Sequence, residues 1–158
     1  MSDYQVRRKD RELGPAETWA VLEQGEFGTL ATVDATGSPY AVPISYVVMD
    51  GQICFHCALV GHKTDNVAVD DRVVFVVVGQ ASAAKNDFAV NYSSAIVFGR
   101  THLVENNEQK HAVLYALAEK YQPALLKAAP EYIRRHFAAT AVYAIQPGKI
   151  TGKARKDK

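Results

Sequence analysis

The chain has 158 residues, which is enough for one domain with its own hydrophobic core. Hydrophobic residues make up 48% of it and charged residues 22%, and this balance excludes disorder over most of the chain. The net charge of +1 gives no general attraction to nucleic acid or to an anionic membrane. Its apolar runs are too short to span a bilayer, and its polar N-terminus lacks the apolar core of a signal peptide, so a soluble, cytoplasmic, single-domain protein is predicted.

The first predicted elements are a helix and then a series of strands. Pro15 suits a first helical turn and Gly25 is a plausible stop, so a helix is expected over 15–24. From Gly28 onward, Val, Ile, Thr, Tyr and Phe dominate, which favours strands at 29–33, 40–49 and 52–58. The first two strands are separated by a polar loop, and Asp50–Gly51 predicts a tight hairpin between the second and the third.

The second half of the chain alternates longer strands with helices. Gly99 permits a β-bulge or a close approach in one of the predicted strands, and Asn106 or Asn107 could cap the helix that follows it. The pattern predicts helices at 61–69, 106–120 and 130–136, strands at 72–79, 91–104 and 139–146, and a small-residue loop at 79–86. Strands joined by tight turns favour a mainly β fold, a six-stranded antiparallel barrel or sheet with short helices at its periphery.

The two cysteines, Cys54 and Cys57, match the C-x-x-C pattern of redox and metal sites. The residues around them are typical of a strand, in which side chains three positions apart point to opposite faces. The pair could therefore neither close an ordinary disulfide nor share one metal ion. Two small buried thiols in a reducing compartment are the simpler interpretation, and no metal site is predicted.

The usual catalytic and nucleotide-binding motifs are missing from the sequence. It contains no G-x-S-x-G, no Walker A loop, no G-x-G-x-x-G and no H-E-x-x-H. The five histidines do not share helical i, i+4 spacing, and the acidic residues give no obvious carboxylate pair. Hydrolase, nucleotide-loop and zinc-peptidase chemistry are therefore disfavoured.

A polar and cationic segment follows the strand at 52–58. There Gly61 turns the chain and Lys63 opens a short helix. The free backbone N–H groups of a helix start, together with a lysine ammonium, form a natural site for an anion, and phosphate is the preferred one. The alternative interpretation is that Lys63 is one more solvated lysine.

Motifs along nearly the whole chain resemble the pyridoxamine 5'-phosphate oxidase-like FMN-binding split barrels, and within them most closely the nitroimidazole-resistance (Nim-type) flavoproteins. Each motif is short, and their order and spacing together carry the resemblance. The matching stretches are Arg7–Arg11, Gly28–Asp34, Gly37–Tyr46, Phe55–Ala58, Gly61–Lys63, Tyr92–Arg100 and Thr151–Lys153.

The resemblance implies a single split-barrel domain over 1–158, with an N-terminal arm at 1–12 and a basic tail at 153–158. It also implies a homodimer with FMN at the subunit interface. The strand that would lie along the flavin ring matches Val42, Pro43, Ile44, Ser45, Tyr46 and Val47. The strand end that would contact the flavin matches His56, Cys57 and Ala58, and the lysine and its neighbour that would hold the phosphate match Lys63 and His62. The strand that would reach the flavin from the partner subunit matches Ser93 and Ser94.

His56 has three interpretations. It could face the flavin or a substrate and donate a proton, since histidine titrates near neutral pH. It could be a hydrogen-bonded strand residue without chemistry, or it could ligate haem, as histidines do in some split-barrel relatives. Tyr40, Tyr46 and Tyr92 could stack on a ring but are more typical of strand packing, and Arg7, Arg8, Arg11 and Arg100 are more typical of interface or solvated charges.

The resemblance predicts a flavin oxidoreductase that moves electrons from a nicotinamide donor to a small organic acceptor such as a nitro compound. One departure from the family bears on the substrate. The vitamin B6 oxidases end in a Trp- and Arg-rich segment, whereas this chain has one tryptophan, Trp19, near its start, which puts B6 oxidation in doubt. The alternatives are a non-catalytic FMN or haem binding or storage protein, and a split-barrel dimer without a cofactor.

Overall fold

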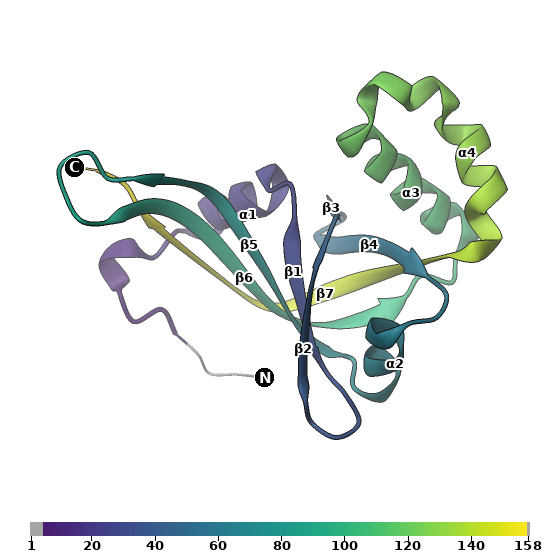
Figure 1. The fold of residues 1–158 in the computed structure, drawn as a ribbon, viewed down its shortest axis with the longest axis horizontal. Helices are drawn as coiled ribbons and strands as arrows, with labels where there is room; N and C mark the ends of the chain where they lie inside the picture. Colours follow the sequence, from purple (N-terminus) through teal and green to yellow (C-terminus); the bar gives the residue numbers. More distant parts are fainter. Residues whose placement is uncertain (1–4, 158) are drawn as a thin grey trace.

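A computed structural model describes residues 5–157 of the chain, so residues 1–4 of the expected arm and residue 158 of the expected tail lie outside the described part. One antiparallel sheet carries four helices (Figure 1). The helices are α1 (Pro15–Gln24), α2 (His62–Val69), α3 (Asn107–Tyr121) and α4 (Ala129–His136), with 3-10 turns η1 (Lys9–Arg11), η2 (Pro123–Ala128) and η3 (Phe137–Ala139). The strands are β1 (Gly28–Val33), β2 (Pro39–Ile44), β3 (Val47–Met49), β4 (Gln52–Ala58), β5 (Arg72–Ala83), β6 (Val90–Leu103) and β7 (Thr140–Arg155).

The sheet has seven strands in the order β2-β1-β5-β6-β7-β4-β3. Its two edge strands, β2 and β3, are consecutive in the chain and are joined only by Ser45 and Tyr46. The sheet must therefore curl until its edges meet at this junction, without closing into a barrel. This confirms the mainly β split-barrel class, with one change: the single strand expected over 40–49 is two strands, because the chain changes edge at Ser45–Tyr46.

A network of long-range hydrogen bonds holds that junction. The backbone N–H of Tyr46 donates to the hydroxyl of Tyr121 at 2.9 Å, and the same hydroxyl lies 3.0 Å from the Tyr46 carbonyl. Lys120 Nζ donates to the carbonyls of Tyr46 (3.0 Å) and Gly25 (2.7 Å) and lies 4.1 Å from the centre of the Tyr46 ring. The end of α3 thus satisfies the backbone groups that the break in strand pairing leaves without a ladder partner.

The core has two parts, one on each face of the sheet. The first fills the curl of the sheet around Tyr46, Phe55 and Phe75, all of which are almost completely buried. The second lies between the outer face of the sheet and α3, and it includes Cys54 and Val142. Strand β4 serves both, because alternate side chains point to opposite faces.

The β5–β6 hairpin extends well beyond the rest of the sheet as an arm (Figure 1). Strand β5 continues to Ala83, so most of the expected loop at 79–86 is strand, and β7 runs on to Arg155 rather than ending at Gln146. The arm is stabilised by ladder pairs that join strands far apart in the chain, such as Tyr92 with Arg155. The pairing of β6 with β7 shifts register between Phe98 and Gly99, and a Cβ at Gly99 would lie 2.5 Å from the carbonyl oxygen of Gln146, so this glycine permits an irregular pairing together with a close approach.

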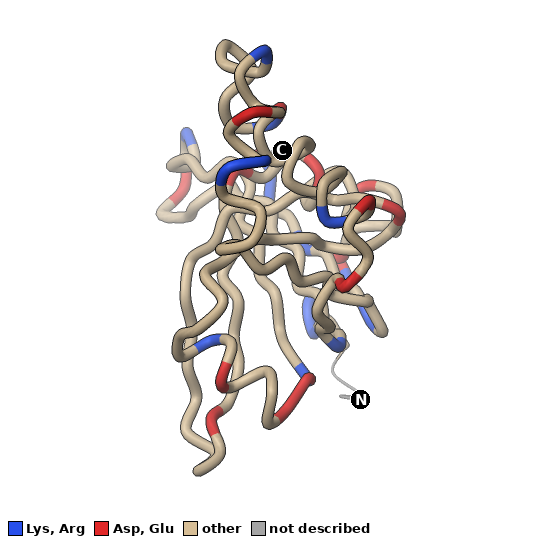
Figure 2. The backbone as a smooth tube through the Cα atoms, turned by 90° about the vertical axis from the view of Figure 1, so that its right-hand side faces the viewer, with Lys and Arg blue, Asp and Glu red and all other residues tan. Residues whose placement is uncertain are grey.

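Charged residues of both signs are interspersed along the backbone in the view of Figure 2. The ion pairs include Arg8–Asp10, Arg72–Asp70, Arg100–Asp71 and Arg155–Asp87.

None of the helices within residues 5–157 combines the length and the apolar character needed to cross a membrane.

Candidate functional site

The turn from β4 into α2 is built around Gly61. Its φ of +152° is unfavourable for other residues, and a Cβ added there would meet no atom within 4 Å. The Gly61 carbonyl accepts the Thr64 hydroxyl at 2.6 Å and the Asp65 N–H at 3.0 Å, which fixes the first turn of α2. No side chain within the described residues caps the helix at Gly61. The first N–H groups of α2 therefore point away from the helix as free donors.

Lys63 lies beside the end of β4. The charge of its ammonium lowers the pKa values of both His56 and Cys57, whose side chains lie on opposite faces of β4 near the end of that strand. Burial of part of the ring and then the Lys63 charge hold the pKa of His56 below its ordinary value. Burial raises the pKa of the Cys57 thiol, and Lys63 opposes this effect. The neutral imidazole and the neutral thiol are therefore the forms favoured around neutral pH.

Helix α2 follows β4 in the chain and also contacts β1 and β2, which lie on the other side of the split. The His62 ring lies 4.4 Å from that of Tyr40 on β2, centre to centre. Farther along the helix, the buried Asn66 amide donates to the Thr32 hydroxyl of β1 at 2.9 Å. The start of α2 is thus held between the β1–β2 pair and the end of β4, and the expected phosphate-binding pair His62 and Lys63 stands at the opening of the sheet.

Strand edges are open at the same place. Strand β3 pairs with β4 as far as the Val47–Cys54 pair, and beyond it β4 pairs, within residues 5–157, with β7 alone. On the other side of the split, the one strand of the described sheet that pairs with β2 is β1. Pro39 and Pro43 have no N–H and are compatible with such an edge. Backbone donors and acceptors of β2 and of the end of β4 are therefore available to a planar polar ligand.

The residues expected along the ring occupy different environments. Val42 and Ile44 turn into the first core, and Pro43 is exposed on the opposite face of β2. Ser45 is half-buried at the bend. Tyr46 is fully buried with its hydroxyl donating to the Leu22 carbonyl, and Val47 belongs to the second core. Since Tyr121 and Lys120 already occupy the backbone groups of Tyr46, the free groups of this segment lie between Val42 and Ser45.

Ser93 and Ser94 are not brought to this cluster within one chain. They pair with Ala154 and Lys153 near the end of β7, whereas His56 and Cys57 pair with Val142 and Ala141 near its start. At about 3.3 Å per residue, Val142 and Lys153 are roughly 35 Å apart along the strand. The remaining expected residues, His56, Cys57, Ala58, His62 and Lys63, do share one region at the end of β4 and the start of α2.

The cysteines lie on the strand that the sequence predicts, but of the two expected buried thiols only Cys54 is buried and Cys57 is half-buried. Both are in β4 and both are free thiols. Cys54 is buried in the second core, and burial raises its pKa to about 11. Cys57, three positions on, points to the other face, so the two sulfur atoms face different environments.

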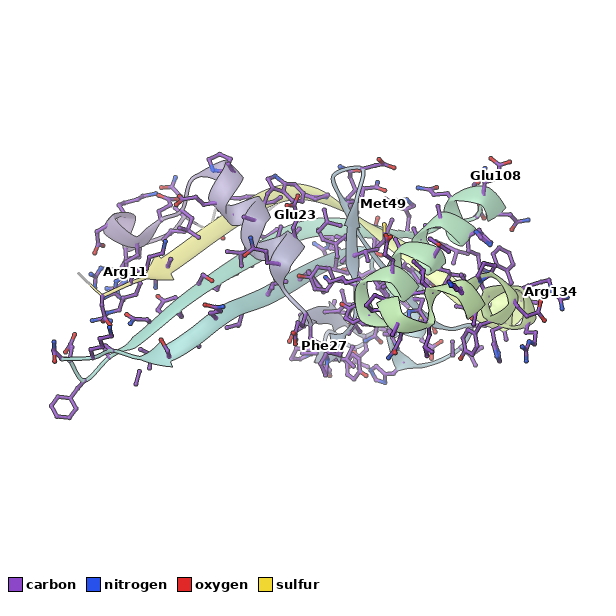
Figure 3. The ribbon with its side chains drawn as sticks, turned by 90° about the horizontal axis from the view of Figure 1, so that it is seen from above. Arg11, Glu23, Phe27, Met49, Glu108 and Arg134 are labelled. Atoms are coloured by element: carbon purple, nitrogen blue, oxygen red, sulfur yellow. The ribbon has the colours of Figure 1, made fainter. Side chains whose placement is uncertain are left out.

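Three of the matching stretches, those that contain Arg11, Tyr92 and Lys153, come together beside the arm. The Leu13 N–H donates to the Gly152 carbonyl at 3.0 Å, and Glu12 forms a bridge with Lys153. Burial raises the pKa of Tyr92, but the cations Lys153 and Arg11 outweigh it and lower the pKa overall. Figure 3 labels Arg11 at this end and Arg134 at the opposite, helical end. These contacts give the terminal motifs a structural role, tying the start of the chain to its end.

The sequence reasoning missed a pocket that adjoins His56. It lies between the sheet and the helical end of the molecule and has a volume of about 510 Å³. Ser45, His56 and Thr140 line it from the sheet side, and residues of α3, η2 and α4 line the rest. The helical periodicity of α3 and α4 was a signal for apolar faces, but it did not indicate that these faces turn toward each other.

The Lys63–His56 interaction can be tested by titration. The NMR titration midpoint of the His56 imidazole is expected below its ordinary value of 6.5. Removing the neighbouring cation in Lys63→Met favours protonation, so the midpoint should rise toward that value. The His56 signal is assigned with His56→Gln. An identical midpoint in wild type and Lys63→Met would show that the ammonium does not lie beside the ring.

The chain matches one protein-family model and is similar to several solved structures. A family model described as pyridoxamine 5'-phosphate oxidase matches residues 14–154. No curated protein matches the chain. Three similar solved structures come from different bacteria. The first is a conserved hypothetical protein from Mycobacterium tuberculosis, with 21% identity and a TM-score of 0.78, and the match covers 95% of this chain and 90% of that one. The second is a candidate 5-nitroimidazole antibiotic resistance protein from Bacteroides thetaiotaomicron, with 16% identity, a TM-score of 0.73 and coverage of 90% of this chain and 86% of that one. The third is a flavocytochrome from Azotobacter vinelandii, with 17% identity, a TM-score of 0.79 and coverage of 98% of this chain and 75% of that one. At these identities the likeness establishes the fold alone.

Proposed function

The chain belongs to the pyridoxamine 5'-phosphate oxidase family, and from this premise we propose that it binds FMN and passes electrons from a nicotinamide donor to a small organic acceptor. The observation that carries the proposal is the cluster at the end of β4, where Lys63 stands beside His56 and Cys57 at the uncapped start of α2.

The donor set of this cluster fits the phosphate of FMN. A phosphate monoester carries close to two negative charges and accepts several hydrogen bonds. The Lys63 ammonium supplies a positive charge, and the first N–H groups of α2 supply donors at the positive end of the helix dipole. His62, held against Tyr40, is placed to add a further donor. The helix holds its N–H groups in place and Tyr40 lies against His62, and this preorganisation favours binding.

The open strand edges fit the flavin ring. Backbone groups between Val42 and Ser45 would bind the polar edge of the ring, with the end of β4 on the other side. Bound FMN would supply two-electron transfer, which the amino-acid side chains present cannot provide. The chain's own contribution is to orient the ring, anchor its phosphate and exclude water. His56, neutral and partly open to solvent, is placed to exchange a proton with a substrate.

A homodimer would complete the site. Ser93 and Ser94 lie on the arm, roughly 35 Å along β7 from the residues paired with His56. They can contribute to a flavin only if a second copy brings its arm to the split of the first. Exposed apolar side chains on the arm support this, since Val78, Phe88 and Val90 are 60%, 110% and 53% exposed. The proposal therefore places Ser93 and Ser94 of the partner subunit against the flavin.

With a nitro compound as acceptor, the overall reaction balances as a two-electron reduction. The nitro compound, NAD(P)H and one proton give the nitroso compound, NAD(P)⁺ and water. Vitamin B6 oxidation is disfavoured, because Trp19 packs against the first core and the basic end of β7 is paired with β6.

A second candidate function is a non-catalytic FMN or haem binding protein. The observation that favours it is that His56 and His136 line the same pocket, so that two imidazoles face one space. A similar solved structure is that of a flavocytochrome. The absorption spectrum separates the candidates, since bound flavin and bound haem absorb at different wavelengths.

The proposal predicts three results for the purified protein. FMN should bind at one per chain, measured by quenching of flavin fluorescence. The protein should be a dimer by light scattering, because the site needs both chains. NAD(P)H oxidation should depend on both FMN and an added nitroaromatic compound. A flavin-loaded protein without turnover would favour the binding-protein candidate, and a monomer that binds no FMN would contradict both the cofactor and the dimer.

A further inference from the structure

The pocket next to His56 is enclosed by two helices and the outer face of the sheet. In α3, Leu114, Leu117, Ala118 and Tyr121 line it, and in α4, Ala129, Tyr132, Ile133 and His136 do so. Each set follows the spacing i, i+3, i+4, i+7, which places its members on one face of its helix. Two helix faces of matching pattern therefore turn toward the same space, at the end of the molecule where Figure 3 labels Glu108 and Arg134.

These two faces do not fill the space between them. Leu125, in η2, is 63% exposed, and Tyr132 is 64% exposed, although both line the pocket. Large apolar side chains that face a partner helix are normally removed from water, because their burial stabilises the fold. The pocket volume of about 510 Å³ is in the range of small-molecule sites. Apolar walls, this volume and incomplete packing together indicate a ligand site.

Polar side chains line the pocket on both sides. On the sheet side, Ser45 and Thr140 contribute hydroxyls and His56 contributes an imidazole, and on the helical side Gln122 and His136 line it. Within the part of the chain that the structure describes, no Lys, Arg, Asp or Glu lines the pocket. A phosphate or carboxylate placed there would lose its hydration without gaining a charged partner, which is costly. Two cations have other partners: Lys120 donates to the carbonyls of Gly25 and Tyr46, and Lys63 is assigned to the flavin phosphate by the proposed function.

We infer that this pocket binds a small, planar, uncharged aromatic molecule, with the ring between α3 and α4 and a neutral polar group, such as nitro or carbonyl, at Ser45 and His56. The inference rests on the proposed function for the identity of this molecule as the electron acceptor. Ser45 and His56 belong both to the pocket and to the residues expected around the flavin, so a ligand in this position has its polar group next to the cofactor.

Matched probes test the ligand class. 4-Nitroanisole and 4-nitrophenyl phosphate carry the same ring and nitro group and differ in the charge of the second substituent. Equilibrium dialysis against the full chain, as purified and after loading with FMN, measures binding without any need for turnover. The neutral probe is expected to bind at least tenfold more tightly than the phosphate ester. Equal binding, or tighter binding of the ester, would overturn the inference.

Two substitutions test the location. Ala118→Phe fills the pocket from α3, and Leu125→Glu adds a charge at an exposed position of its wall without disturbing a packed side chain. Each should weaken binding of 4-nitroanisole at least tenfold. The matched control is Ala112→Phe, on an exposed face of the same helix outside the pocket, which should leave binding unchanged. Thermal unfolding checks that each variant is folded.

The outcomes separate this inference from the proposed function. Selective binding that both pocket variants weaken, in a protein that never oxidises NAD(P)H, would support the pocket and contradict the oxidoreductase. Turnover of 4-nitroanisole with an unchanged KM in both pocket variants would support the oxidoreductase and place the acceptor elsewhere. A haem spectrum that is lost in His56→Gln would assign the pocket to haem instead and overturn the inference.

Discussion

Lys63→Ala is expected to weaken FMN binding by about ten- to a hundredfold, which corresponds to about 1.5–3 kcal/mol for a hydrogen bond to a charged group. The change removes the side-chain cation at the second position of α2, whose charge acts on His56 and Cys57. The N–H groups of α2 remain, so some affinity for the phosphate should survive. Fluorescence titration of the flavin-free protein with FMN measures the effect.

Two further variants make this test specific. Lys63→Arg keeps the positive charge and should retain most of the affinity. Lys127→Ala removes an exposed lysine from η2 and should have no effect on FMN binding. Riboflavin, which lacks the phosphate, should bind equally to wild type and Lys63→Ala. If riboflavin binding fell as much as FMN binding, Lys63 would be acting on the flavin ring or on the fold and not on the phosphate.

Gly28→Ala is expected to reduce the free energy of unfolding by about 1–3 kcal/mol, the usual range for overpacking a core. A Cβ at position 28 would lie 2.0 Å from Cζ of Phe75 and 2.6 Å from two further atoms of that ring. Phe75 is fully buried and packs edge-on against Tyr46 at a centroid distance of 4.9 Å, so the ring has little room to move. Urea denaturation of the variant and the wild type measures the difference.

A double-mutant cycle with Phe75→Leu checks the cause. Phe75→Leu alone should destabilise the protein, because it removes part of a buried ring. In that background Gly28→Ala should cost less than about 1 kcal/mol, since the smaller side chain leaves space for the new methyl group. Strictly additive effects would mean that the cost of Gly28→Ala does not arise from the contact with Phe75. The backbone at position 28 would then be the alternative cause.

Part of the candidate site followed from the sequence because its residues are close together in the chain. The end of β4, the turn at Gly61 and the start of α2 span only a few residues, so local signals were enough to propose an anion site at Lys63. The pocket had no such signal. Its walls come from α3, η2, α4 and the sheet, and only packing decides that Leu117, Tyr132 and His56 face one space.

The same division holds for the fold. Helix α1, strand β4 and the hairpin at Asp50–Gly51 formed where the sequence predicted them, and Asn106 caps α3 by accepting the Gln109 N–H. Propensities, caps and turn geometry act between near neighbours, and they are legible in the sequence for that reason. They also led to the correct mainly β class, an antiparallel barrel or sheet, whereas the split barrel was implied by the family resemblance.

The tertiary structure alone decided where the strand over 40–49 breaks and how long the last strands are. Tyr46 changes sheet edge because Tyr121 and Lys120, far along the chain, satisfy its backbone groups. Strand β7 continues to Arg155 because β6 offers a ladder partner as far as Tyr92. Hydrogen bonds between distant segments stabilise such features only after the chain has folded, so the residues around Ser45 or Lys153 do not predict them by themselves.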